Sequence, residues 1–256
     1  WNADHWELIS LSAAQQEGMD QSRALFSEAA AQGHMVAQVM CGDMYCFGKG
    51  VPKDDRLAFG YYEKAAHQGD SRSQFNLGVH YSHGCGCEQS YERAAEWLEK
   101  AARQGQSEAM FVLGTLYHNG EGVPQSFTRA FQLYQQSRDT GNTNPVLYFN
   151  LGVCYEYGHG VDKDYLEARR LYKLASAQGY AQATNALNRL DEKIRTECPL
   201  LGKQVVITGT SRGDLNGRAR NATSFDHERD RYVVELLNDT DTTQTPRESE
   251  DGDGGN

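Results

Sequence analysis

This sequence of 256 residues lacks several features that would assign a function directly. It contains no apolar run near the roughly 20 residues that a membrane-spanning helix needs, and it does not open with the charged and then apolar segment of a secretion signal. A formal net charge of -10 argues against generic binding to nucleic acid or anionic membranes. No HExxH zinc motif occurs, and no nucleophile elbow is predicted, because Asn216-Gly217 breaks the helix that would have to follow the Gly-x-Ser-x-Gly letters at 209–213. We therefore expect no nucleic-acid partner, no membrane span and no catalytic centre of these common types.

One sequence pattern recurs four times along the chain. The pattern has the form (Leu or Cys)-Gly-x-x-Tyr-x-x-Gly-x-Gly-(Val or Cys) and begins at Cys41, Leu77, Leu113 and Leu151. The step between copies is 36 residues twice and then 38. A fixed period in this range is typical of stacked supersecondary units, so residues that recur at one position in every copy build the stack.

Each copy predicts two helices joined by a glycine turn. In the copy at 71–105, residues 73–82 form the first helix, and Ala94, Leu98 and Ala101 give the second helix an apolar stripe. The second helices open with residues that cap helices well, namely Asp54, Ser90, Ser126 and Asp164. They end at the helix-stopping glycines Gly33, Gly69, Gly105, Gly141 and Gly179. Each copy is therefore predicted to be a helical hairpin.

A second set of glycines lies inside the first helices, at Gly42, Gly78, Gly114 and Gly152. A glycine inside a helix costs about 1 kcal/mol relative to alanine. Its recurrence therefore predicts a close helix–helix approach, with Ala58, Ala94, Ala130 and Ala168 of the second helices as the expected neighbours. Such hairpins cannot bury their apolar faces alone and must stack on one another.

The order of the units follows from these positions. We expect a solenoid over residues 1–197, a small β-module over 199–237 and a disordered acidic tail over 238–256. The solenoid divides into units at about 5–33, 34–69, 70–105, 106–141 and 142–179, followed by a capping helix at 181–197. In the opening unit, residues 5–17 would be a degraded first helix. The last unit carries a two-residue insertion near 142–145.

These motifs resemble the Sel-one-like repeat family, a subfamily of tetratricopeptide-like solenoids. The match is nearly residue for residue over Leu113–Val123 and over Leu151–Val161, and the resemblance covers about residues 20–197. It implies a mainly α fold in which αα-hairpins form a right-handed superhelix, the α-solenoid. It also implies an adaptor that holds partners on its concave face, without catalytic residues and without a cofactor. We expect a monomer.

The cysteine positions and the first residue give information on the cellular compartment of the protein. Cys41 and Cys154 stand where other units place Leu or Met, and Cys87 stands where they place Val, so small buried side chains explain all three. This favours a reducing compartment, cytoplasmic or otherwise soluble and intracellular. Because residue 1 is Trp1 rather than Met, we expect a piece of a longer protein, so the missing targeting signal says little.

After Pro199 the pattern changes to short β-branched segments near 201–209, 218–225 and 231–236. They are similar to a small β-module found beside repeat and MYND-finger segments, and closure of a barrel stays open because Arg220 replaces a usual glycine. Three short strands make a marginal core, so this module is expected to dock on the last helix. The stretch Val205–Gly213 imitates a dinucleotide-binding loop, but Leu215 replaces the required glycine and too few residues follow.

One cluster could bind a metal, namely His80, His83, Cys85 and Cys87. Imidazole and thiolate groups are zinc ligands. However, His80 and Cys87 occupy packing positions, which leaves His83 and Cys85 as the weak metal candidates. The alternative to a scaffold is therefore a metal-binding or hydrolytic variant that uses the loop from His80 to Cys87.

The preferred hypothesis is a non-catalytic scaffold for protein–protein interaction, in which the first helices bind a partner segment. The candidate partner-binding residues are polar side chains at two recurring positions that we expect to be exposed, namely Gln38, Gln74, Asn76, Tyr148 and Asn150. They could also belong to an ordinary solvated face. A third hypothesis is that the β-module recognises the partner and that the repeats only display this module.

Overall fold

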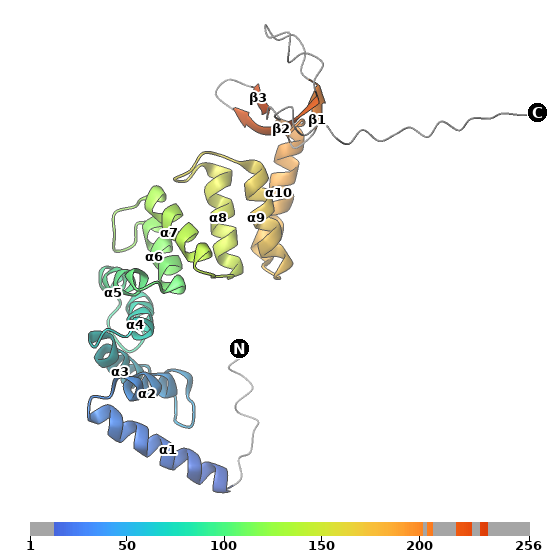
Figure 1. The fold of residues 1–256 in the computed structure, drawn as a ribbon. Coiled ribbons are helices and arrows are strands. Elements are labelled where there is room, and N and C mark those ends of the chain that lie inside the picture. The colour runs from blue at the N-terminus through green and yellow to red at the C-terminus, as the bar shows by residue number, and fades with distance from the viewer. Residues whose placement is uncertain (1–12, 202–203, 207–218, 227–230, 235–256) are drawn as a thin grey trace, which may run out of the picture.

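The computed structural model describes residues 13–201, 204–206, 219–226 and 231–234 of the chain. Helices dominate these ranges, and three short strands follow them (Figure 1). The helices are α1 (Ala13–Ala31), α2 (Met35–Phe47), α3 (Asp55–His67), α4 (Ser71–His83), α5 (Tyr91–Arg103), α6 (Ser107–Asn119), α7 (Phe127–Asp139), α8 (Pro145–Tyr157), α9 (Tyr165–Ala177) and α10 (Ala181–Glu197). The strands are β1 (Gln204–Val206), β2 (Ala219–Asp226) and β3 (Arg231–Val234).

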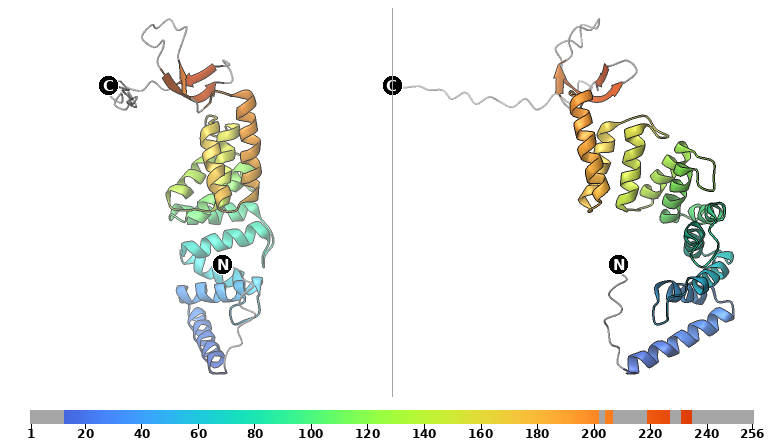
Figure 2. Two further views of the ribbon diagram at one scale, coloured as in Figure 1. Left: turned by 90° about the vertical axis from the view of Figure 1, so that its right-hand side faces the viewer. Right: turned by 180° about the vertical axis from the view of Figure 1, so that it is seen from behind.

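The helices form stacked hairpins, as the repeat predicts. The pairs α2 with α3, α4 with α5, α6 with α7, and α8 with α9 pack most extensively, and each second helix also packs on the first helix of the following hairpin. The stack bends into an open arc with α1 at one end and α10 at the other (Figure 1), and it is narrow from the side (Figure 2). Helices α2 and α4 lie toward the inside of the arc, whereas α3 and α5 lie toward its outside.

The predicted caps hold the second helices in place. The carboxylate of Asp54 accepts hydrogen bonds from the backbone N–H groups of Arg56 and Leu57 at 3.0 and 2.9 Å. Ser90, Ser126 and Asp164 accept equivalent bonds in the other units. Just past these helices, the glycines at 33, 69, 105, 141 and 179 have φ between 83° and 98°, which is the left-handed stop that the sequence predicts.

The glycines inside the first helices make room for a large side chain. A Cβ at Gly42 would lie 2.6 Å from the ring of Tyr62, and one at Gly152 would lie 2.6 Å from the ring of Tyr172. Leu98 and Tyr134 occupy the same place against Gly78 and Gly114. The predicted close approach is confirmed, but these large residues, four positions beyond the expected alanines, fill the space. The alanines are fully buried beside them.

The apolar core follows the stack as a series of clusters that span neighbouring helices. One cluster joins Leu77 and Leu98 to Leu113 and Leu133, and another joins Tyr134 to the buried leucines of α8. A further cluster packs α9 and α10 with Cys198 and Leu201. Neighbouring hairpins therefore share apolar residues, which is what lets units that cannot fold alone support one another.

The opening unit differs from its prediction. Residues 13–17, expected to end a separate first helix, are instead the start of α1, which continues without interruption to Ala31. Gly18 does not break the helix, because the Gly-x-Gly turn that ends the other first helices is absent here. The remainder of the expected helix, residues 5–12, lies outside the described residues.

The three strands pair antiparallel in the order β1-β2-β3. Val205 pairs with Arg220, and Phe225 pairs with Tyr232. Ala222 of β2 is fully buried, and β2 contacts α9, whereas the sequence predicted docking on the last helix. The segments between the strands and the expected acidic tail at 238–256 lie outside the described residues, so closure of a barrel stays a prediction. Among the described helices, none is long and apolar enough to cross a membrane.

Candidate functional site

The first helices of the hairpins leave one face uncovered by their neighbours, which we call the inner face. It comprises Val36, Met40, Phe47, Arg72, Phe75, Asn76, Glu108, Phe111, Val112, Val146, Phe149 and Asn150, all at least partly exposed. Aromatic rings recur at one position, at Phe75, Phe111 and Phe149, where they are partly exposed and also pack against the core. The surface is therefore mainly apolar, with amide groups between the apolar side chains.

The apolar character is strongest on α2. Val36 is 62%, Met40 39% and Phe47 60% exposed, although side chains of this kind are usually buried. Exposed apolar side chains that cluster on one helix are typical of an interaction surface. Sequence reasoning missed these three residues because the search for a site looked for polar groups. The signal was the apolar residue at the position of Arg72 in α4 and Glu108 in α6.

Two of the predicted partner-binding residues are buried rather than exposed. Gln38 and Gln74 are buried, so the prediction that they are exposed is wrong. The amide of Gln74 donates to the carbonyl of Ala66 at 3.2 Å, and its oxygen accepts from the amide of Gln104 at 2.8 Å. Gln104 also donates to the carbonyl of Gly69 at 3.1 Å.

Gln38 repeats this arrangement one unit earlier. It donates to the carbonyl of Ala30 at 3.2 Å and accepts from Gln68 at 2.7 Å, and Gln68 also donates to the carbonyl of Gly33 at 3.0 Å. We call the pairs Gln38 with Gln68 and Gln74 with Gln104 the glutamine clamps. Each clamp ties the end of one second helix to the next hairpin, so these amides hold units together.

The other three predicted residues are partly exposed. Asn76 lies on the inner face, and within the described residues its amide has no hydrogen-bond partner. Asn150 also lies there, but it donates to the hydroxyl of Tyr134 at 3.4 Å. Tyr148 occupies the clamp position in α8 and packs against the cluster between α7 and α8. Of the five predicted residues, Asn76 is thus the one on the inner face whose amide has no hydrogen-bond partner within the described residues.

Buried tyrosine hydroxyls of the second helices contact the first helix of their own hairpin, and a side chain of the next unit joins each of these contacts. Tyr62 of α3 donates to Asp43 of α2 at 2.8 Å, and Arg72 of α4 forms an ion pair with the same carboxylate. Burial first, and then the hydrogen bond to Asp43, raise the pKa of Tyr62 well above its ordinary value. The hydroxyl therefore stays protonated and acts only as a donor to the carboxylate.

Similar connections occur further along the stack. Tyr172 of α9 donates to the buried Glu156 at 2.7 Å, and Arg189 of α10 contacts the same carboxylate at 3.2 Å. Tyr134 of α7 makes only long contacts of 3.4 Å, to Thr115 and Asn150, and burial raises its pKa to about 12. These charged and phenolic groups bond to one another inside the fold. Few charged side chains therefore remain on the inner face.

The loop from His80 to Cys87 is occupied by internal contacts. The ring of His80 is buried between Phe59 and Tyr62, and its Nδ1 lies 2.7 Å from the carbonyl oxygen of Cys85. Cys87 directs its thiol to the carbonyl of His80 at 3.6 Å, and burial raises the pKa of that thiol.

The weak metal candidates do not gain a third ligand. His83 is exposed, and its Nδ1 lies 2.9 Å from the carbonyl oxygen of Val79, while Cys85 is a free, half-buried thiol. In the part of the chain that the structure describes, no three His, Cys, Asp or Glu side chains gather closely enough to hold a metal ion.

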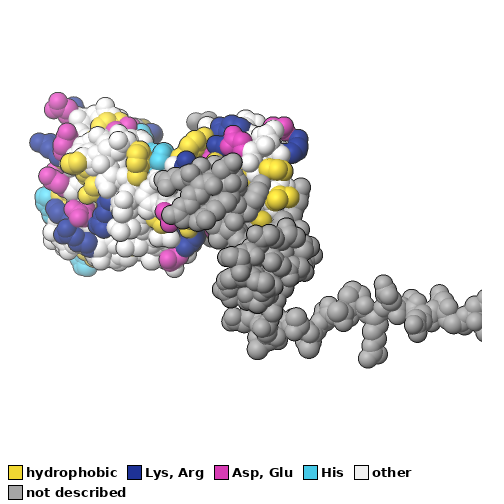
Figure 3. Space-filling view, turned by 90° about the horizontal axis from the view of Figure 1, so that it is seen from above, with side chains coloured by type: hydrophobic (Ala, Val, Ile, Leu, Met, Phe, Trp, Pro, Cys, Tyr) yellow, Lys and Arg dark blue, Asp and Glu magenta, His cyan; other side chains and the backbone are white. Residues whose placement is uncertain are grey.

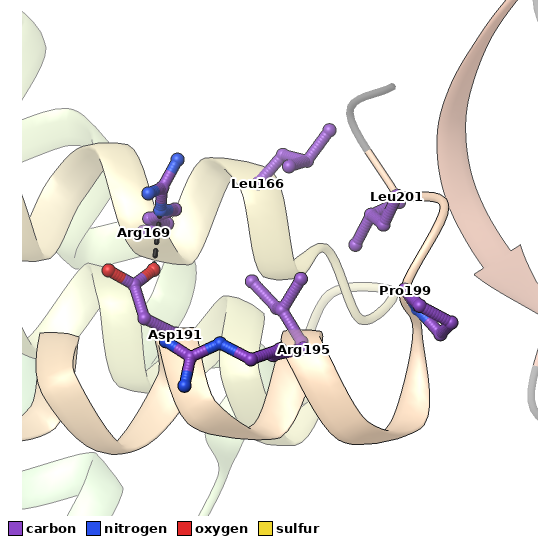
Figure 4. A pocket seen from close by; sticks show the side chains of 7 residues that line it. Leu166, Arg169, Asp191, Arg195, Pro199 and Leu201 are labelled. Carbon is purple, nitrogen blue, oxygen red and sulfur yellow. Dashed lines mark hydrogen bonds and ion pairs between the residues drawn. The ribbon is translucent and has the colours of Figure 1, made fainter. Parts of the chain in front are cut away.

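A pocket of about 410 Å³ lies at the other end of the stack, between α9, α10 and the turn after α10. Leu166, Ile194, Pro199 and Leu201 form its apolar wall (Figure 4). Its two arginines are each held by an acid, Arg169 by Asp191 and Arg195 by Glu192. The arrangement offers an apolar recess but no unpaired group for chemistry.

Charges of both signs are mixed on the surface seen along the stack. On the face shown in Figure 3, basic and acidic side chains alternate with polar and apolar ones, and no continuous basic area covers the described part. This face therefore lacks the basic stripe that marks an electrostatic footprint for nucleic acid.

Comparison with known proteins identifies the repeat. The family model described as "Sel1 repeat" matches residues 18–34, 36–70, 71–106, 107–142 and 145–180, which together are more than half of the chain. These ranges agree closely with the units seen in the structure. Among curated proteins, none matches the sequence.

Several solved structures are similar to this chain. A Sel1 repeat protein from Oxalobacter formigenes is 30% identical, with 69% of this chain and 74% of that chain covered and a TM-score of 0.56. The protective antigen c5321 of uropathogenic Escherichia coli, described as displaying an SLR fold, is 27% identical over 67% of this chain and 44% of its own, with a TM-score of 0.49. The Helicobacter pylori cysteine rich protein B is 18% identical over 50% of this chain and 91% of its own, with a TM-score of 0.39.

Proposed function

This chain belongs to the Sel1 repeat family, and we propose that it is a scaffold whose inner face binds a segment of a partner protein. The observation that supports this most is the exposed apolar surface of α2, at Val36, Met40 and Phe47. Most other strongly polar groups of the first helices are used to hold the units together. The remaining surface favours an apolar segment with backbone groups that the amide of Asn76 can bind.

The proposal includes the absence of catalysis. The chemically capable groups near the His80 loop are engaged with backbone carbonyls, and burial raises the pKa of the Cys87 thiol, which disfavours the reactive thiolate. The metal-binding or hydrolytic variant remains the alternative, and it predicts stoichiometric zinc that is lost on His83→Ala. Metal analysis of the purified full chain distinguishes the two.

Several finer features belong to the same proposal. We infer a right-handed superhelix, a monomer, and a reducing intracellular compartment, the last because all six cysteines are free. The strands after α10 are proposed to form the small β-module that resembles those beside MYND-finger segments. In this proposal they stabilise the end of the stack against α9.

The experiment is a selection of displayed peptides against the full chain, followed by affinity measurement on two matched variants. Met40→Asp places a charge on the inner face, where the side chain is 39% exposed, and Leu57→Asp places one on the outer helix α3, where it is 44% exposed. We expect Met40→Asp to weaken the selected peptides at least about tenfold, because a charge would be desolvated in an apolar contact. Leu57→Asp should leave binding unchanged.

The same measurement separates the competing hypotheses. Peptides that bind both variants equally would contradict an inner-face site. If their binding were instead lost when residues 199–256 are deleted, the β-module would be the reader of the partner.

A further inference from the structure

Two histidines and a phenylalanine form a cluster where the units 106–141 and 142–179 meet. His118 lies in the last turn of α6, Phe127 is the first residue of α7, and His159 lies between the two glycines of the turn after α8. The rings of Phe127 and His159 stack with centroids 4.1 Å apart and planes 9° apart. His118 contacts Phe127 edge-on at 5.1 Å and His159 at 5.4 Å.

Neither imidazole is compensated by a polar partner. The Nδ1 atoms of His118 and His159 are buried, and within the described residues neither has a hydrogen-bond partner. No carboxylate of α6, α7, α8 or the described turns pairs with either ring. The titratable neighbours are the other histidine and Tyr157 of α8, whose ring lies 5.8 Å from that of His159. His159 also lies against the start of α7, where the helix dipole disfavours a positive charge.

The cluster lies at a junction between two units that has few other contacts. Helices α7 and α8 pack less extensively than the other neighbouring helix pairs of the stack. Tyr148 replaces the clamp glutamine, and Gln178, which takes the place of Gln104, bonds within its own helix to the carbonyl of Leu174 at 3.4 Å. Residues 142–144 add length to the connection. Contact between the turn and α7, where Gly160 lies directly on the backbone of Phe127, is therefore important to this junction.

We propose that the cluster of His118, Phe127 and His159 makes the α7/α8 junction an acid-sensitive hinge. Protonation would place one or two positive charges in an apolar ring cluster without a counterion. The turn at 158–161 would then leave the start of α7, and α8–α10 would move relative to α2–α7. The spacing between α6 and α8 on the inner face would change with pH, and any partner segment that spans both helices would be released.

The direction of the pKa shifts agrees with this geometry. Burial, and then the charge of His159, lower the pKa of His118 from the ordinary value of 6.5, and burial lowers the pKa of His159. The closed junction therefore prefers neutral imidazoles. Its stability is fully present above pH 6.5, falls as the pH drops from 6.5 toward the lowered values, and levels off below them.

The test combines two measurements on the full chain. Histidine Cε1–H resonances are titrated by NMR, and hydrogen exchange of α8–α10 is followed at pH 7.5 and about pH 5.5, with rates corrected for intrinsic chemistry. Between pH 7.5 and about pH 5.5, each cluster histidine whose NMR pKa lies one unit or more below 6.5 should raise the opening constant of α8–α10 about five- to tenfold. His159→Gln should reduce this rise, whereas the control His83→Gln, on the exposed end of α4, should leave it intact.

Three results would overturn the proposal. These are pKa values of 6.5 or above for both His118 and His159, an opening constant of α8–α10 that does not change with pH, and an acid response of equal size throughout α2–α6. If His159→Gln fails to fold, the titration and the exchange of the unaltered chain still decide the matter.

Discussion

At the α3/α4 junction, Gln74 is held from both sides, by the carbonyl of Ala66 and by the amide of Gln104. At the α7/α8 junction the same position carries Tyr148, and the contact between units consists of apolar packing, the rings of His118, Phe127 and His159, and a long hydrogen bond of 3.4 Å from Asn150 to Tyr134. Both junctions bury leucines and have glycine turns of one design. The difference teaches that apolar burial stacks the units, whereas directional hydrogen bonds decide how firmly neighbouring units are held in register.

The largest expected effect comes from the glycine turns that touch the preceding unit. A Cβ at Gly122 would lie 2.2 Å from the backbone of Tyr91, and the residue has φ of +68°. Gly122→Ala should lower the free energy of unfolding by about 3 kcal/mol or more, because backbone must move and the conformation is strained. Urea denaturation measures this.

Two further glycines sharpen the comparison. Gly160→Ala introduces a similar clash with Phe127, but at the weakly held junction, so the turn can move away and the loss should be smaller. Gly105→Ala meets nothing within 4 Å and should cost only about 1–2 kcal/mol, from its φ of +86°. Equal losses for Gly122→Ala and Gly160→Ala would remove the distinction between the two junctions.

The next effect concerns the buried tyrosines. Tyr62→Phe leaves the buried Asp43 without its 2.8 Å donor and should cost about 2 kcal/mol, since the bond is to a charged group. Tyr134→Phe removes two contacts of 3.4 Å and should cost only about 0.5 kcal/mol. Thermal and urea unfolding of the two variants check the difference, and a larger loss at Tyr134 would reverse the ranking of the two regions.

The glutamine clamp can be converted into the apolar form found elsewhere in the chain. Gln74→Met copies α6, where Met110 occupies the same position, and should cost about 1–2 kcal/mol because two hydrogen bonds are lost. A double-mutant cycle with Gln104→Ala should give a coupling of about 1 kcal/mol. Additive effects of the two substitutions would show that the clamp contributes nothing as a pair.

One substitution is expected to stabilise the protein. Ser73 is fully buried in α4, and its hydroxyl has no partner within the described residues. Ser73→Ala should raise the free energy of unfolding by about 1 kcal/mol, since α6 carries Ala109 at this position and an unsatisfied group is removed. The control Ser126→Ala removes a helix cap and should cost about 1 kcal/mol. A loss of stability in Ser73→Ala would mean that the hydroxyl has a partner after all.

Much of the stack follows from the sequence because its causes are local. The caps Asp54 and Ser126, and the glycine stops after each second helix, act within a few residues of themselves. The unit boundaries could therefore be predicted from the repeat alone. In contrast, α1 was predicted to be broken near residue 17, because the expected partner helix was inferred from symmetry rather than from a turn signal.

The candidate site was harder to predict because its determinants are separated by about one repeat. Gln74 looks like a surface residue until Gln104, 30 residues later, is known to reach it. A signal was present in the recurrence of this pair at Gln38 and Gln68 and in the loss of both partners together at Met110 and Thr140. The exposed apolar residues of α2 carry no such pairing, so their role depended on the structure.

The most direct test of the two kinds of junction is native-state hydrogen exchange of the full chain at neutral pH, measured residue by residue over rising urea. Our account predicts that the amides of α8–α10 open as one block with a lower free energy than the amides of α2–α6, with the boundary at residues 140–145. A single opening free energy shared by α2–α10 would contradict it, because the α7/α8 junction would then be as firm as the junctions before it.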